Sequence, residues 1–168
     1  MATRREALKW SMGALAGLAA GWPTRWAQAE APDSLAVVVA KSSPIRHMSQ
    51  FELKKLYLGS NITDPTGQRI VPFNQAPKSP DRAAFDSRVL GMTPDEVAAY
   101  WIDRKIRGQS GAPKSVGSPE LVQRVVSRLE HSITYVRFDQ VLPEMRIISI
   151  DGAIPGEAGY KLMAWLDR

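Results

Sequence analysis

The stretch Leu35-Ala36-Val37-Val38-Val39-Ala40 decides the fold class of this chain. Its six residues are all apolar and three are β-branched. Such a run predicts a strand covered on both faces, because a strand with one wet face alternates apolar with polar residues. The turn Lys41-Ser42-Ser43-Pro44 ends the strand,. We therefore expect this strand to lie inside a sheet that has helices on its faces.

Four helices are predicted downstream, each from the residues that start it. Ser49 and Glu52 form a capping box, which predicts a helix to about Leu58 with Gly59 as its stop,. Three further starts are a Ser or Thr followed by Pro, and they predict helices over 80–90, 94–106 and 119–129,. The apolar side chains expected on their buried sides are Phe51, Leu53, Leu56, Tyr57, Val97, Ala98, Trp101, Ile102, Leu121, Val122, Val125, Val126 and Leu129,.

The remaining elements complete an α/β domain. Strands are predicted over 69–73, 133–137 and 145–150, followed by an Asp151-Gly152 turn and a short closing helix within 157–168,. Strands that alternate with helices predict a mixed sheet flanked by helices. The length of residues 30–168 suits one domain with one core,.

Residues 1–29 have the pattern of a cleavable export signal. A basic start at Arg4, Arg5 and Lys9 precedes a short apolar stretch that ends in the small-residue run 27–29,. The basic part is similar to a twin-arginine motif, and the general secretory route is the alternative. A membrane anchor is disfavoured, because the apolar stretch is shorter than the roughly 20 residues that span a bilayer. We expect Glu30 to begin a soluble, periplasmic mature protein.

Charge and composition exclude several classes of partner. Without the four basic residues and one acidic residue of the leader, 18 basic and 16 acidic residues remain of the chain's 22 and 17. The basic pI is therefore largely a property of the leader, and no nucleic-acid partner is expected. The chain has no cysteine, which excludes disulfides, thiolate metal sites and lipid attachment at the cleavage site,.

The sequence predicts no enzyme, no metal site and no cofactor. Its two histidines, His47 and His131, have no metal-ligand spacing relative to each other or to a carboxylate pair,. No serine lies in a G-x-S-x-G turn, and no phosphate-loop or dinucleotide glycine pattern occurs,.

One helix start offers a candidate anion site. Ser79 opens the helix predicted over 80–90, Arg82 follows one turn in, and Asn74 comes at the end of the preceding strand. Backbone amides and the positive end of the helix dipole attract anions at such a position. Ser42 and Ser43, after the first strand, are further hydroxyl donors if both strand ends meet at one sheet edge,. The alternative is a capped helix with a solvated or ion-paired Arg82.

Several segments together resemble the phosphate-binding-protein-like periplasmic binding family, specifically its short single-lobe members. The resemblance covers most of residues 35–162 in order. The segments that carry it are Phe51-Glu52-Leu53-Lys54-Lys55-Leu56-Tyr57-Leu58-Gly59, Ser79-Pro80-Asp81-Arg82-Ala83-Ala84-Phe85, Val89-Leu90-Gly91, Tyr100-Trp101, Ser118-Pro119-Glu120-Leu121-Val122, Ile133-Thr134-Tyr135-Val136 and Ile148-Ser149-Ile150-Asp151-Gly152.

This resemblance implies one lobe of a type 2 periplasmic-binding fold and a phosphate or other oxyanion held by amides, hydroxyls and an arginine. The chain departs from the family where Lys78-Ser79-Pro80-Asp81 replaces the Ser-Gly-Thr of full-length members. Pro80 removes an amide donor, and Asp81 places a carboxylate near the anion. Because full-length members close two lobes over the ligand, one lobe is expected to bind weakly.

These features predict a periplasmic solute-binding-like protein that acts as a transport accessory or sensor. Its expected ligand is inorganic phosphate or a similar oxyanion, held by Ser79, Arg82 and Asn74 with Ser42 and Ser43. The alternative is a non-catalytic interaction module that has lost ligand binding. Such a module would dock to a membrane sensor or to a transporter permease.

Overall fold

The computed structural model describes residues 34–162. The predicted leader, residues 1–29, and the last part of the predicted closing helix, residues 163–168, lie outside this range. Within residues 34–162, no helix is long and apolar enough to cross a membrane.

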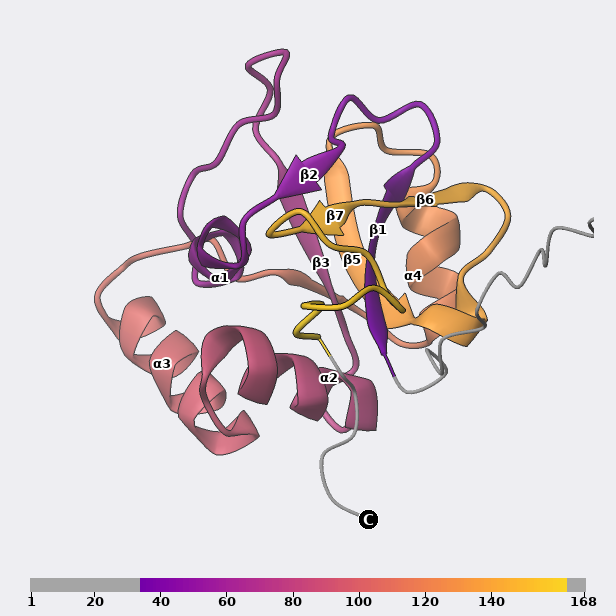
Figure 1. Cartoon of the computed structure of the whole chain (residues 1–168). Helices are drawn as coiled ribbons and strands as arrows, with labels where there is room; N and C mark the ends of the chain where they lie inside the picture. The colour runs from indigo at the N-terminus through magenta and orange to yellow at the C-terminus, as the bar shows by residue number, and fades with distance from the viewer. Residues whose placement is uncertain (1–33, 163–168) are drawn as a thin grey trace, which may run out of the picture.

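The described chain alternates short strands with helices, as the sequence predicts (Figure 1). In chain order the elements are β1 Leu35–Ala40, β2 His47–Met48, α1 Gln50–Tyr57, β3 Val71–Gln75, α2 Pro80–Phe85, the π-helix η1 Asp86–Leu90, α3 Pro94–Ile106, β4 Lys114–Val116, α4 Pro119–Val126, β5 Ser132–Arg137, the 3₁₀-helix η2 Phe138–Gln140, β6 Met145–Ile147 and β7 Ser149–Ile150.

Five strands form one mixed sheet in the order β4-β3-β5-β1-β6. β3 runs parallel to both β4 and β5, whereas β1 runs antiparallel to both β5 and β6. The register sets Leu35 opposite Arg137 and Val39 opposite Ile133. β2 and β7 form a separate two-stranded parallel sheet.

The first strand is buried on both faces, which confirms the prediction from its apolar run. Ala36 and Val38 join a cluster beneath α4, with Val122 and Val126. Leu35, Val37 and Val39 face a larger cluster to which α1, α2, η1 and α3 contribute. Figure 1 shows α4 on one side of the sheet and the other three α-helices on the opposite side. The alternating direction of side chains along a strand explains why β1 serves two cores.

The helix starts are confirmed. Ser49 and Thr93 accept hydrogen bonds from the backbone amides of Glu52 and Glu96, and both capping boxes are complete. α3 has the bounds that the sequence predicts. The segment 80–90 is helical throughout, but it changes from α to π geometry at Asp86 before Gly91 ends it in a left-handed conformation, with φ 68°.

Several element boundaries differ from the prediction. The strand expected over 69–73 is β3, Val71–Gln75, so Asn74 lies within the strand and does not follow it. The strand expected over 145–150 is split into β6 and β7, which belong to different sheets. Residues 157–162 form turns and backbone without regular secondary structure, so the predicted closing helix is wrong over this part.

Some apolar side chains expected in the core are exposed. Phe51 is 69% exposed and Ile102 is 59% exposed, and Ala98, Leu121 and Leu129 also lie at the surface. Trp101 is partly buried and packs against the edge of the larger cluster. Each helix covers only part of the sheet, so the buried stripe is narrower than the apolar pattern suggests.

Candidate functional site

The strand directions divide the predicted site residues between two edges of the sheet. Because β5 runs antiparallel to β1 and parallel to β3, the carboxyl end of β3 lies beside the amino end of β1. Ser42 and Ser43 follow the carboxyl end of β1 and therefore lie at the opposite edge from Asn74. The expectation that they join the same site is wrong, because it assumed that β1 and β3 point the same way.

Asn74 and Arg82 do come together, in a cavity of about 280 Å³ between the end of β3, α2, η1 and α3. Asp86 and Ser115 also line this cavity, which we call the β3 pocket. Asn74 Oδ1 accepts hydrogen bonds from the hydroxyl of Tyr135 and from the backbone amide of Gln75. The amide nitrogen of Asn74 is therefore the end that remains available to a ligand.

Arg82 is held in place by three groups. Its Nη1 donates to the carbonyl oxygen of Gln75 at 3.1 Å and to Oγ of Ser115 at 3.3 Å. Its Nε lies 3.6 Å from Oδ2 of Asp86, one helical turn further on. Within residues 34–162, Nη2 of Arg82 makes no hydrogen bond, so one edge of the guanidinium is free for an acceptor.

Asp86 is a site residue that the sequence analysis missed. Its side chain is only 2% exposed. Burial raises the pKa of this carboxyl to about 6, against the opposing effect of the Arg82 charge. Arg82 and Asp86 are four residues apart on one predicted helix, and oppositely charged side chains at this spacing are expected to pair. This spacing is the signal in the sequence that indicates the pair.

Ser79 and Asp81 lie outside the lining of the β3 pocket. Ser79 donates its hydroxyl to Oε1 of Gln75 at 2.7 Å and does not cap its own helix. Asp81 is buried, and this burial raises its pKa, with Gln75 and Arg137 as opposing influences. The carboxylate that faces the pocket is thus that of Asp86 and not, as expected, that of Asp81.

One wall of the β3 pocket is apolar. It is formed by Pro94, Ala98 and Trp101 from α3, with Ala112 and Pro113 from the segment before β4. Trp101 packs edge-on against Tyr100, with the ring centroids 5.1 Å apart. The β3 pocket therefore combines a cation, a carboxylate and an amide with an apolar wall.

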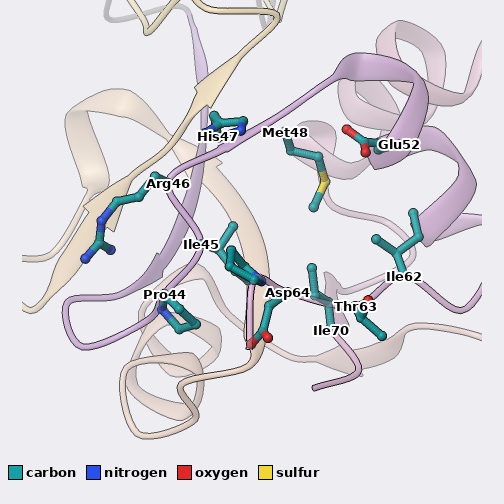
Figure 2. A pocket seen from close by; sticks show the side chains of 11 residues that line it. Pro44, Ile45, Arg46, His47, Met48, Glu52, Ile62, Thr63, Asp64 and Ile70 are labelled. Carbon is teal, nitrogen blue, oxygen red and sulfur yellow. The ribbon is translucent and has the colours of Figure 1, made fainter. Parts of the chain in front are cut away.

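A second cavity of about 280 Å³ lies at the opposite sheet edge, beyond the loop that contains Ser42 and Ser43 (Figure 2). Its lining is mainly apolar, and Figure 2 shows Arg46 pointing away from Asp64 and Ile70. Ser43 is buried, and its hydroxyl oxygen accepts the backbone amide of Ile45. Its carbonyl accepts Arg146 at 2.9 Å. Ser43 thus has a structural role in this loop, whereas Ser42 is exposed.

No group of three or more His, Asp or Glu side chains is arranged to hold a metal ion within residues 34–162.

Comparison with solved structures identifies the fold. An ABC-type phosphate transport receptor from Vibrio cholerae superposes with a TM-score of 0.59 at 22% identity, over 73% of this chain and 48% of the receptor. A putative phosphate ABC transporter substrate-binding protein from Clostridium perfringens, solved with bound phosphate, gives 0.59 at 20% identity over 73% and 47% of the two chains. PstS from Borrelia burgdorferi gives 0.56 at 18% identity over 73% and 49%.

This chain therefore has a phosphate-binding-protein-like fold, and its mixed sheet with flanking helices matches a single lobe of it. It spans about half the length of these structures. No protein-family model and no curated protein sequence matches the chain.

Proposed function

We propose that this chain is a non-catalytic, periplasmic solute-binding-like protein that binds an oxyanion weakly in the β3 pocket. In this proposal it serves as a transport accessory or sensor, with a transporter permease or a membrane sensor as its protein partner. The observation that carries the proposal is that Asn74 and Arg82 converge on one cavity at the carboxyl end of β3. Ligands gather at such strand ends in open α/β sheets.

The free edge of the Arg82 guanidinium supplies the charge for an oxyanion. Charge-assisted hydrogen bonds from an arginine are stronger than neutral ones. The Asn74 amide and the Ser115 hydroxyl add neutral donors on the same side of the cavity. The solved structures with this fold include one that holds phosphate, which supports an oxyanion as the ligand class.

Asp86 limits the affinity for a simple anion. Its carboxylate lies 3.6 Å from Arg82 Nε and offsets the positive charge that would attract a second anion,. We expect dissociation constants between roughly micromolar and millimolar, equivalent to about 4 to 8 kcal/mol of binding free energy. The same ion pair favours a second candidate function, a docking module for a membrane sensor or transporter that has lost ligand binding.

Thermal unfolding in a phosphate-free buffer tests the proposal. Phosphate or sulfate at millimolar concentration should raise the Tm, since a ligand that binds only the folded state stabilises it. The double variant Arg82→Gln with Asp86→Asn should abolish this shift. It removes the guanidinium without leaving a buried carboxylate unpaired, as Arg82→Ala alone would.

The matched control is Arg107→Gln with Asp103→Asn, which changes an exposed pair with the same four-residue spacing at the carboxyl end of α3, outside the pocket. This control should retain the full shift. If the unmodified chain shows no shift in Tm and no heat of binding with either anion, oxyanion binding is excluded and the docking module becomes the better explanation.

A further inference from the structure

The β3 pocket contains an acceptor that no protein group satisfies. Oδ1 of Asp86 is buried and has no hydrogen-bond partner within residues 34–162. Two buried tyrosines that the charge of Asp86 influences use their hydroxyls elsewhere, Tyr57 for the carbonyl of Phe73 and Tyr135 for Asn74. A buried carboxylate oxygen without a donor is unfavourable, so its presence requires an explanation.

A ligand with a positively charged donor would satisfy this oxygen. The acceptor belongs to a side chain that lines the pocket, and Arg82 on the same pocket still has a free Nη2. Arg82 and Asp86 form an ion pair, with Arg82 Nε and Asp86 Oδ2 3.6 Å apart, and this pair keeps one acceptor, Asp86 Oδ1, and one donor nitrogen, Arg82 Nη2, without a partner within residues 34–162. Sulfate, which carries no hydrogen-bond donor, can use only the guanidinium, and hydrogen phosphate, which can donate a hydroxyl to Asp86, leaves the apolar wall of the pocket uncovered.

We infer that the β3 pocket selects a small α-amino acid, whose carboxylate binds Arg82 and Asn74 and whose ammonium binds Asp86. This inference rests on the proposed function, because it takes the carboxylate as the oxyanion of that same site. In an α-amino acid the two charged groups share one carbon and lie roughly 3 Å apart by standard bond lengths. Its two charged groups can therefore reach two protein side chains that are themselves in contact, as Arg82 and Asp86 are.

The size and the apolar wall of the pocket restrict the side chain of the ligand. A volume of about 280 Å³ lies just below the range of roughly 300–1,000 Å³ that is typical of sites for larger organic ligands,. Pro94, Ala98 and Trp101 present apolar surface beside the charged pair. The pocket therefore suits a short aliphatic side chain better than a long or charged one.

Calorimetry with matched ligands tests the inference on the unmodified chain. The probes are L-alanine and L-valine, their analogues without the amino group, propionate and 3-methylbutanoate, and their analogues without the carboxyl group, ethylamine and 2-methylpropylamine. Each amino acid should bind at least tenfold more tightly than either of its analogues, because only it satisfies both charges. An amino acid that binds no more tightly than its carboxylate analogue would overturn the inference.

The variant Asp86→Asn separates the role of this carboxylate from a general effect on the fold. It should remove the preference for amino acids over the carboxylate analogues, and the affinity for these analogues should rise because the charge that offsets Arg82 is removed,. Asp103→Asn, an aspartate with the same four-residue spacing to an arginine but outside the pocket, should change neither. Equal losses for amino acids and carboxylates in Asp86→Asn would indicate a merely structural role and overturn the inference.

The two proposals fail separately. A response to phosphate without a preference for amino acids overturns the inference and leaves the proposed function standing. The absence of any response to phosphate, carboxylates and amino acids overturns both. If Asp86→Asn does not fold, the comparison of the three ligand types on the unmodified chain still decides the inference.

Discussion

The carboxylate of Asp64 shows how one side chain organises a loop. Its Oδ1 accepts the backbone amide of Thr66 at 2.8 Å, the hydroxyl of Thr66 at 2.6 Å and the backbone amide of Gln68 at 3.1 Å. Its Oδ2 contacts Nδ1 of His131, the residue before β5. Burial opposes ionisation, but these hydrogen bonds dominate and lower the pKa of Asp64 from 3.8 to about 2,.

This shift predicts an acid-sensitive contribution to stability. A carboxyl with a depressed pKa in the folded state stabilises the fold above its ordinary pKa, and this contribution is lost as the pH falls from about 4 to about 2,. Asp64→Asn should lower the urea midpoint at pH 6 and flatten its decline between pH 4 and pH 2. The exposed Asp103→Asn is the control and should keep the shape of the original curve. A variant curve parallel to the original would contradict the prediction.

Only some of the site residues could be predicted from the sequence. Asn74 and Arg82 are eight residues apart across one strand–helix connection, so local order alone brings them to the same pocket. The positions of Ser42 and Ser43 depend on the relative direction of β1 and β3. No residue within either strand encodes that direction. Asp86 was within reach of the sequence, because its spacing from Arg82 is a helical repeat.

Among the helices and strands, the predictions succeeded where nearby residues mark the start of an element. Caps such as Ser49 and Thr93 satisfy amides within one turn of themselves, and the sequence therefore predicts where α1 and α3 begin,. β2, β4 and β7 have only two or three residues each. Such strands exist only because a neighbouring strand pairs with them, and no periodicity can develop over so short a length.

The junction between α1 and α3 supplies a prediction about a glycine. Gly59 has φ 89°, and a Cβ atom there would lie 3.0 Å from Cη2 of Trp101. Gly67 has a similar φ, 82°, but open space around it. Gly67→Ala should cost roughly 1–2 kcal/mol of unfolding free energy from backbone strain alone.

Gly59→Ala should cost more than this, because the Trp101 ring must also move. Urea unfolding of the two variants measures the difference, which reports the contact between the end of α1 and α3. Equal losses in the two variants would contradict a fixed position of Trp101 against Gly59.

For the whole molecule, the prediction of export concerns residues 1–29, which lie outside the described residues. Residues 1–29 are expected to direct the chain to the periplasm, with Glu30 as the mature N-terminus, and β1 begins shortly afterwards at Leu35. Changing both Arg4 and Arg5 to Lys should block export if the twin-arginine route is used, which fractionation and mass spectrometry would measure. Unhindered export of this double variant would assign the leader to the general secretory route.

The first and last described segments of the chain hold each other in place. The backbone amide of Leu35 donates to the carbonyl of Leu162 at 2.7 Å, and the Tyr160 hydroxyl donates to the carbonyl of Leu35 at 2.5 Å. Tyr160 and Leu162 are buried in the larger cluster. The segment after β7 therefore covers the amino end of β1 without forming a helix.

The hydrogen bond from Tyr160 to Leu35 predicts the effect of removing the Tyr160 hydroxyl. Tyr160→Phe should cost about 1–3 kcal/mol of unfolding free energy, because the buried Leu35 carbonyl loses a donor that no water replaces,. Tyr100→Phe is the matched control, since the Tyr100 hydroxyl also donates to a backbone carbonyl, that of Leu58. Arg104 Nη1 donates to the same carbonyl at 3.3 Å, so Leu58 keeps a partner and the loss should be smaller. Equal losses in urea unfolding would show that the segment containing Tyr160 does not shield Leu35 from solvent.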